Sequence, residues 1–194
     1  MGAILQSLGR TVFAGVVLLV IMLGVAGTFG KMGDHAWATF FMRWLHVLSG
    51  VMWIGLLWYF NFVQTPSMPK IPDEQKPAIG KVIAPEALFW FRWAALATIV
   101  TGLLVATMSG YIKVLFTFQA PYQAIAIGMW LGIIMAFNVW FIIWPNQKKA
   151  LGMVQVEAAE KAAAARTAML TSRLNTMLSI PMLYCMVAQQ NGGL

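Results

Sequence analysis

The chain has 194 residues, of which 60% are hydrophobic and only 10% are charged, and its mean hydropathy is +0.76. A soluble domain carries roughly a quarter charged residues, so this composition excludes a soluble globular protein and indicates an integral membrane protein. The net charge of +7 does not indicate nucleic acid as a partner, because the basic residues lie at the ends of apolar segments. The lone Cys185 excludes an intrachain disulfide, a cysteine-based zinc site and a c-type haem attached through Cys-x-x-Cys-His.

The predicted fold is an all-α membrane bundle of about five transmembrane helices, since a helix needs ~20 apolar residues to cross the hydrocarbon. Residues 1–194 are expected to form a single membrane domain. The first span begins near Thr11 and is interpreted as an anchor, Pro66 and Pro69 are expected to end the second, and Pro85 begins the third. The predicted spans are residues 11–30, 37–64, 85–109, 122–144 and 167–188, and a charged, alanine-rich helical extension is expected at 147–166.

The distribution of lysine and arginine predicts the orientation, because short cytoplasmic segments are enriched in these residues. With the N-terminus in the cytoplasm and the C-terminus outside, ten of the 13 basic residues lie on or near the cytoplasmic side. Only Lys31, Arg43 and Lys113 remain on the other side. The helical extension then lies in the cytoplasm, and the lack of an internal repeat disfavours a two-half transporter.

A histidine and an arginine lie inside the second predicted span, where ionisable groups are costly and mark a functional-site hypothesis. Arg43 is one turn before His46, Gly50 is one turn after it, and Trp53 follows on the same face. We hypothesise a b-type haem site in which His46 binds the iron, Gly50 clears space for the ring and Arg43 pairs with carboxylates. A quinone or an organic substrate at the same place remains open, as does a structural role in which His46 bonds to another span and Gly50 admits a neighbouring helix.

The remaining polar residues in the spans include Asn138, Asn175 and Ser179, whose expected role is hydrogen bonding between helices. A small-residue face at Gly128, Gly132 and Ala136 predicts a seam where a neighbouring helix packs closely. No motif for nucleophilic attack or phosphate binding occurs, and the acidic residues all lie in connections or at helix ends, so a buried carboxylate for ion pumping is absent.

Several segments of the sequence resemble a known family. They are RWLHVLSG at 43–50 leading to WYFNFVQTP at 58–66, PEALFWFRWAA at 85–95, NVWFIIWPNQK at 138–148, and SRLNT at 172–176 with SIPM at 179–182. These segments are similar to the N-terminal domain of the bacterial membrane urate oxidase (urate hydroxylase) family, without the C-terminal cytochrome c domain that some members carry.

The resemblance implies a module of the bacterial inner membrane that takes part in urate oxidation and passes electrons to the respiratory chain. Because this chain lacks Cys-x-x-Cys-His, we expect a membrane redox module that delivers electrons to a separate acceptor and holds any haem without a covalent bond. The alternative is a non-catalytic accessory subunit that packs within a larger respiratory or photosynthetic membrane complex. Expected partners are therefore the lipid bilayer and other membrane subunits or an electron acceptor.

Overall fold

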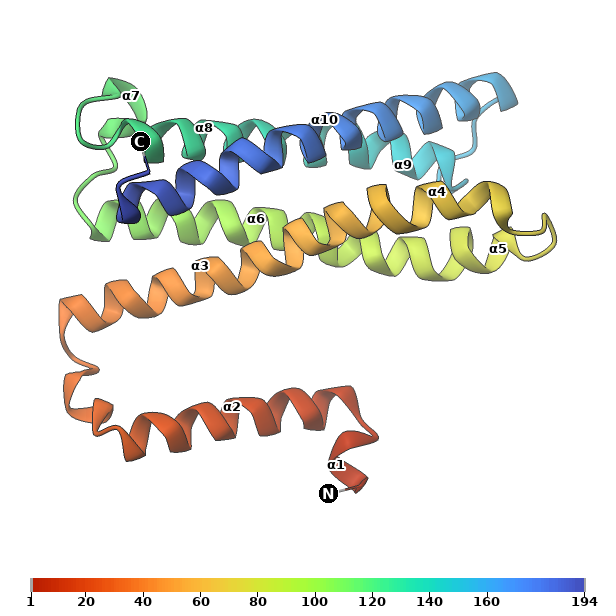
Figure 1. Ribbon diagram of the computed structural model, residues 1–194. Helices are drawn as coiled ribbons and strands as arrows, with labels where there is room; N and C mark the ends of the chain where they lie inside the picture. Colours follow the sequence, from red (N-terminus) through yellow and green to blue (C-terminus); the bar gives the residue numbers. More distant parts are fainter. Residues whose placement is uncertain (1, 194) are drawn as a thin grey trace. The chain divides into compact units, whose positions relative to one another are not determined.

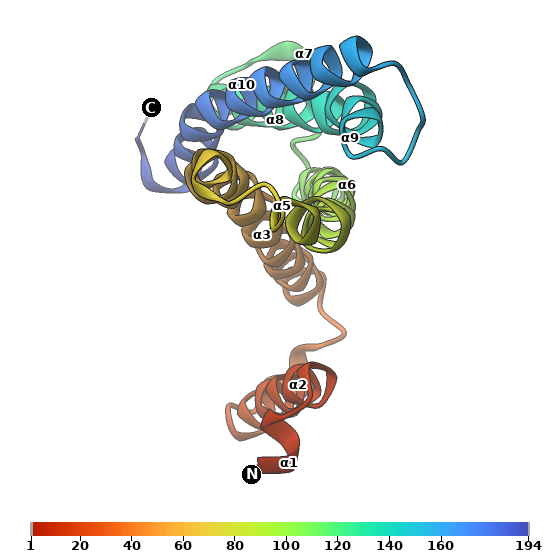
Figure 2. The same ribbon diagram turned by 90° about the vertical axis from the view of Figure 1, so that its right-hand side faces the viewer.

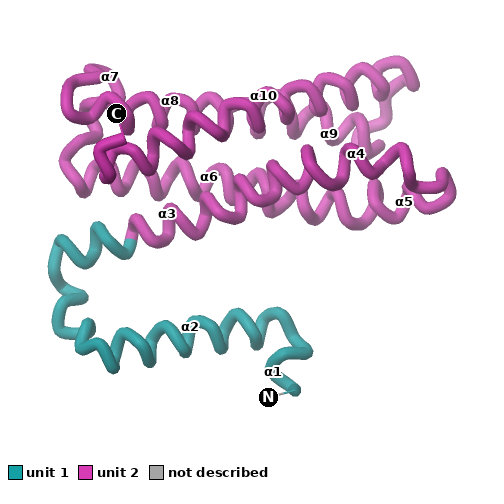
Figure 3. The backbone as a smooth tube through the Cα atoms, in the orientation of Figure 1, with its two compact units in different colours: residues 1–41 teal, residues 42–194 magenta. Residues whose placement is uncertain are grey.

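The computed structural model describes residues 2–193, which form helices and connections and contain no strand. By their internal contacts the residues divide into two compact units, Met1–Phe41 and Met42–Leu194, shown in different colours in Figure 3. Helix α3, His35–Trp58, runs through the boundary between the two units. Contacts within the chain do not test the predicted single membrane domain, which stays a prediction.

The first unit contains α1 (Gly2–Leu5), α2 (Leu8–Val25) and the short 3-10 helix η1 (Thr28–Lys31). The apolar α2 corresponds to the span predicted at 11–30, and no residue in it is buried. It ends earlier than predicted because Gly27 adopts a left-handed backbone with φ 67°, which a continuing right-handed helix cannot contain.

The second unit is a bundle in which four long helical segments run alongside one another (Figures 1 and 2). Viewed along the helices in Figure 2, α3 and α6 lie on one side, and α8 and α10 lie on the other. The bounds are Ala84–Met108 for α6, Gln123–Phe137 for α8, Trp144–Ala150 for α9 and Ala158–Asn191 for α10. The short α4 (Thr65–Ser67), η3 (Met68–Lys70) and α5 (Lys76–Ala78) join α3 to α6, and α7 (Val114–Thr117) precedes α8.

Three π-helical segments interrupt these long helices, each two residues before a proline. They are η2 (Tyr59–Gln64) before Pro66, η4 (Ile79–Ile83) before Pro85 and η5 (Asn138–Ile143) before Pro145. A proline ring has no N–H to donate and clashes with the carbonyl four residues earlier, and a wider π turn at that carbonyl gives it room. The helices therefore continue past Pro66 and Pro145, to Lys70 and to Ala150. The sequence predicted that they would end before these prolines.

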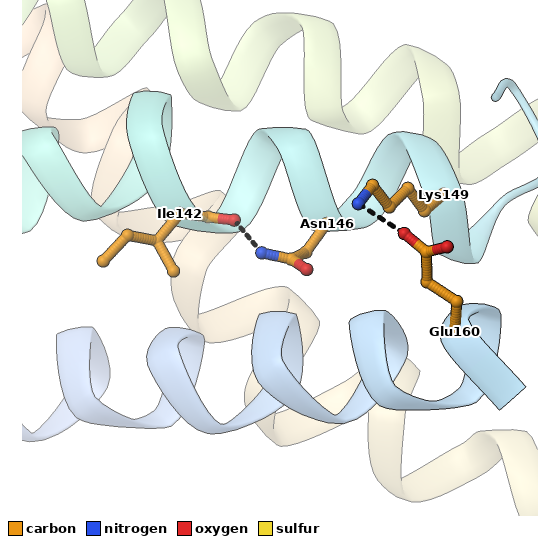
Figure 4. A network of polar contacts seen from close by, with 4 residues as sticks. All are labelled: Ile142, Asn146, Lys149 and Glu160. Atoms are coloured by element: carbon orange, nitrogen blue, oxygen red, sulfur yellow. Dashed lines mark hydrogen bonds and ion pairs between the residues drawn. The ribbon is translucent and has the colours of Figure 1, made fainter. Parts of the chain in front are cut away.

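The predicted helical extension at 147–166 is wrong in one respect, because residues 151–157 are not helical. The reason is Gly152, whose φ of 76° ends α9. α10 then begins at Ala158, and the two helices are joined by an ion pair between Lys149 Nζ and Glu160 Oε1 at 2.7 Å. Figure 4 shows this pair beside the bond that Asn146 donates to the Ile142 carbonyl within the preceding turn.

Within residues 2–193, four helices are long and apolar enough to cross a membrane, judged by length and composition. They are Leu8–Val25, His35–Lys70, Lys76–Met108 and Gln123–Ala150. The 34-residue α10, which contains the fifth predicted span, packs along α8 and α9. That α10 crosses the membrane, and that the N-terminus is cytoplasmic, stay predictions.

Helices α8 and α10 approach each other closely at Gly128. A Cβ at this position would lie 3.1 Å from Cys185 Cβ and 3.5 Å from the Met182 carbonyl oxygen. Of the three residues in the predicted seam, Gly128 thus meets α10, whereas a Cβ at Gly132 would have only Ile99 on α6 within contact distance. Ala136 is buried in the bundle core.

We predict that Gly128→Leu lowers the stability of the bundle, because the side chain must push α10 away from α8. Overpacking of this kind costs about 1–3 kcal/mol, and the thermal unfolding midpoint in detergent should fall accordingly. Gly15→Leu in α2 is the matched control, since a Cβ there has nothing within 4 Å. Equal unfolding midpoints for the two variants would contradict the close packing at Gly128.

Candidate functional site

A cavity of about 660 Å³ lies between α3, α6, α8 and α10. Its volume falls within the roughly 300–1,000 Å³ that is usual for small-molecule and cofactor sites. Val47, Val51 and Val187 line it and are also exposed, so the cavity opens at the outer surface of the bundle. Most of the lining is apolar, and the residues with polar side-chain groups are Arg43, His46, Trp53, Trp58, Thr98, Tyr111, Gln190 and Asn191.

His46 reaches from α3 to the backbone of α6. Its Nδ1 lies 2.9 Å from the Thr98 carbonyl oxygen and 3.3 Å from Thr101 Oγ1. A carbonyl only accepts hydrogen bonds, so Nδ1 carries the proton and donates it. In the neutral ring Nε2 then carries the lone pair, and the described residues supply no hydrogen-bond donor to it. His46 therefore presents the cavity with a nitrogen that can accept a proton or bind a metal.

Gly102 on α6 makes room for this imidazole. A Cβ at Gly102 would lie 2.8 Å from His46 Cε1 and 3.2 Å from His46 Nδ1, which is closer than packed atoms approach. The ring is thus held by the Thr98 carbonyl on one side and by the bare backbone of Gly102 on another. This fixes both the orientation of the ring and the nitrogen that carries the proton.

The end of the cavity nearest Arg43 is positively charged. Arg43 forms no ion pair among the described residues, in which the ion pairs join Lys76 to Asp73 and Lys149 to Glu160. After position 41, every acidic residue lies just before or in the first turn of α5, α6 or α10. Arg43 lies beside the opposite ends of α6 and α10. Those acidic residues are Asp73, Glu74, Glu86, Glu157 and Glu160. An anionic group on a ligand would therefore be favoured at this end of the cavity.

Tyr111 lies in the connection after α6 and stacks on Tyr122, with ring centroids 5.6 Å apart. Burial raises the pKa of Tyr111, and the positive charge of Arg43 opposes that rise only in part. The phenol consequently stays protonated at neutral pH and keeps its O–H as a donor. Together with Arg43 it gives this end of the cavity two groups that suit a carboxylate or another oxyanion.

The other two residues predicted at this site also line the cavity. A Cβ at Gly50 would meet only Thr98 Cγ2, at 3.9 Å, so this glycine leaves space beside α6. Trp53 is only 1% exposed, and its Nε1 has no hydrogen-bond partner among the described residues. A buried donor without an acceptor is costly. The structure therefore brings Arg43, His46, Gly50 and Trp53 together along one cavity wall, in the order in which they follow along α3.

The polar residues Asn138, Asn175 and Ser179 lie outside the cavity lining. Asn138 Nδ2 donates to Asn175 Oδ1 at 2.8 Å, and Asn175 Nδ2 donates to the Met135 carbonyl at 2.9 Å. Ser179 accepts a bond of 3.0 Å from Trp58 Nε1. All these bonds join α10 to neighbouring helices, and α10 is thereby tied to both sides of the bundle.

Sequence reasoning missed five residues of this site: Thr98, Gly102, Tyr111, Gln190 and Asn191. A glycine after a threonine in a span is a weak signal, because many such glycines serve only helix packing. Tyr111 and the pair at 190–191 lie outside the predicted spans, and only the arrangement of the bundle places them near Arg43.

Comparison with known families agrees with the resemblance seen in the sequence. The family model described as Urate oxidase N-terminal matches residues 103–192, slightly less than half of the chain. The matched region includes the segments at 138–148 and 172–182, and the segments around His46 and Arg92 precede it. Neither the curated proteins nor the solved structures gave a match.

We predict that Gly102→Ala displaces the His46 ring and breaks its bond to the Thr98 carbonyl. Nitrogen NMR of the histidine side chains measures the protonation of each ring nitrogen. The signals are easily assigned, because the chain has only two histidines. In the wild type the His46 signals should show a protonated Nδ1 and a bare Nε2, and in the variant this pattern should be lost.

His35 serves as the internal control, since it lies in the first unit, where its Nε2 is 3.4 Å from Thr39 Oγ1. Its signals should not change. Identical His46 signals in Gly102→Ala and the wild type would contradict the packing described above.

Proposed function

We propose that this chain is a membrane redox module that binds a b-type haem through His46 and passes electrons to a separate acceptor. The observation that supports the proposal best is the free Nε2 of His46 beside a cavity large enough for a cofactor. The family match over residues 103–192 supports an oxidative context without naming a cofactor.

The residues around the cavity fit a haem. An imidazole that ligates iron usually donates its other N–H to a carbonyl or carboxylate, which fixes the ring and makes it more basic. The bond from His46 Nδ1 to the Thr98 carbonyl is of this kind. Gly50 and Gly102 keep side chains away from the ring on α3 and α6, and the apolar lining suits a flat hydrophobic body.

The positive end of the cavity fits the carboxylates that a haem carries on one edge. Arg43 is one turn of helix from His46, about 4.5 Å along the axis, and has no anionic partner among the described residues. Tyr111 adds an O–H donor at the same end. In this arrangement Arg43 neutralises the carboxylates and His46 holds the iron deeper in the bundle.

His46 alone would suffice to hold a haem iron, because a single histidine holds the iron in many haem proteins. Three methionines, Met129, Met182 and Met186, line the cavity, but methionine in an apolar bundle usually serves packing. We assign none of them to the iron.

Haem supplies one-electron redox chemistry when it is bound. The chain contributes the environment: His46 holds the ligand in place, Thr98 orients His46, and the apolar lining excludes water from the ring. With His46 Nε2 used to hold the iron, the residues that line the cavity would include no carboxylate and no second imidazole to take a proton from a substrate. The proposed role is therefore electron transfer rather than acid–base catalysis.

We predict that protein purified from haem-supplied cells shows a Soret band and that His46→Ala abolishes it. His35→Ala is the matched control, because it removes the only other histidine, and its spectrum should equal that of the wild type. The thermal unfolding midpoints of both variants show whether a lost Soret band reflects the missing histidine or an unfolded protein.

A folded wild type without a chromophore, or a folded His46→Ala with an unchanged spectrum, would overturn the haem proposal. If that chromophore-free protein also co-purified in mild detergent with respiratory or photosynthetic subunits, the accessory-subunit alternative would account for it.

We also predict that Arg43→Gln releases haem about five-fold faster, because a partly exposed charge pair contributes roughly 1 kcal/mol. Transfer of haem to an excess of a haem-scavenging apoprotein measures this rate. Lys113→Gln is the control, since Lys113 is exposed and does not line the cavity. Equal release rates for the two variants would show that Arg43 does not hold the carboxylates.

A further inference from the structure

Arg92 lies far from the cavity lining, on the half of α6 that begins at Ala84. Its guanidinium carbon is 3.9 Å from the centre of the Trp144 ring and 5.4 Å from the centre of the Phe89 ring. Its hydrogen bond, from Nη1 to the Leu88 carbonyl, is long at 3.4 Å. A guanidinium has five N–H donors in its plane. Stacking on Trp144 therefore leaves N–H groups at the edge of Arg92 that can donate to another acceptor.

A second cation approaches the same indole. Lys148 Nζ is 5.7 Å from the centre of the Trp144 ring, so Arg92 and Lys148 converge on one side chain. Neither takes part in an ion pair among the described residues, where the acidic partners are Asp73 and Glu160. An anion bound beside this indole would therefore find two positive charges near it.

The position of this pair along the helices matches a membrane interface. A span needs ~20 residues, so counting back from Met108 places the opposite interface near Leu88, the residue to which the Arg92 side chain turns. Counting forward from Gln123 along α8 and η5 places the same interface near Trp144. Both helices thus indicate that the two cations lie at the level of the lipid head groups.

The surface around the cations is aromatic and faces lipid. Phe89, Trp90, Trp93 and Phe141 are exposed, with Trp90 51% and Phe141 68% exposed. Such residues collect where head groups meet acyl chains. The backbone there is also fixed, because Trp140 Nε1 donates to the Arg92 carbonyl at 3.1 Å.

We propose that Arg92 and Lys148 bind the phosphate of an anionic phospholipid, with Trp144 stacked beneath the guanidinium. The edge of Arg92 donates two N–H groups to two phosphate oxygens, which is the geometry that guanidinium favours. Lys148 contributes a second charge from the aqueous side, and the acyl chains lie along the exposed aromatic surface. This site is independent of the haem proposal, because it uses none of the cavity residues.

Native mass spectrometry of the full chain, with equal amounts of dioleoylphosphatidylglycerol and dioleoylphosphatidylcholine, tests this site. The wild type should retain the anionic lipid preferentially. Arg92→Gln and Lys148→Gln should each weaken its retention about five-fold, as expected for one basic residue at an interface, and the double variant should lose the preference.

Lys113→Gln removes one exposed lysine from the other end of α6 and should bind lipid as the wild type does. Lys148→Gln keeps the test valid if Arg92→Gln fails to fold, because among residues 2–193 the Lys148 side chain forms no hydrogen bond or ion pair and approaches Trp144 of its own helix α9. Equal retention of the two lipids by the wild type, or unchanged preference in folded Lys148→Gln, would overturn the proposal. Inorganic phosphate that displaced the lipid at equal concentration would do so too, since it would show a site for free anions.

Discussion

The arrangement of polar groups in this bundle follows from one constraint, that a polar group buried among apolar side chains must find its partner within the protein. Most do: Asn175 bonds to Asn138 and to a backbone carbonyl, and Trp58 bonds to Ser179. These bonds tie α10 to its neighbours although α10 is less apolar than the other long helices. Because most buried polar groups have a protein partner, the groups that lack one indicate where a ligand binds.

The cavity beside α3 collects such groups. Among residues 2–193, His46 has one nitrogen bonded to α6 and one without a partner, Arg43 has no counter-ion, and Trp53 has a buried N–H without an acceptor. A ligand with a metal centre and carboxylates would satisfy the first two of these. The opposite end of α6 presents a different case, because Arg92 is stacked on Trp144 there, and we propose that it binds a lipid phosphate. One helix would then contribute to two sites of different chemistry.

Hydropathy alone predicted the bundle and located its apolar helices, and the scarcity of charge inside spans singled out Arg43 and His46. The partner of His46 could not be predicted, because Thr98 and Gly102 are more than fifty residues away and meet it only through packing of α3 on α6. Pro66 was read as the end of the second span, and the fourth span was predicted to end before Pro145, since nothing in the sequence shows that a π turn will accommodate each ring. The break at Gly152 was missed because the residues around it have high helix propensity.

If His46 Nε2 faces a bound group in the cavity, a density map of the full chain purified from haem-supplied cells should reveal that group. We expect flat density joined to Nε2, with its carboxylates at Arg43 and Tyr111, and with the bond from Nδ1 to the Thr98 carbonyl intact. A cavity filled by lipid chains or by neighbouring side chains, with Nε2 bonded to another protein group, would contradict it.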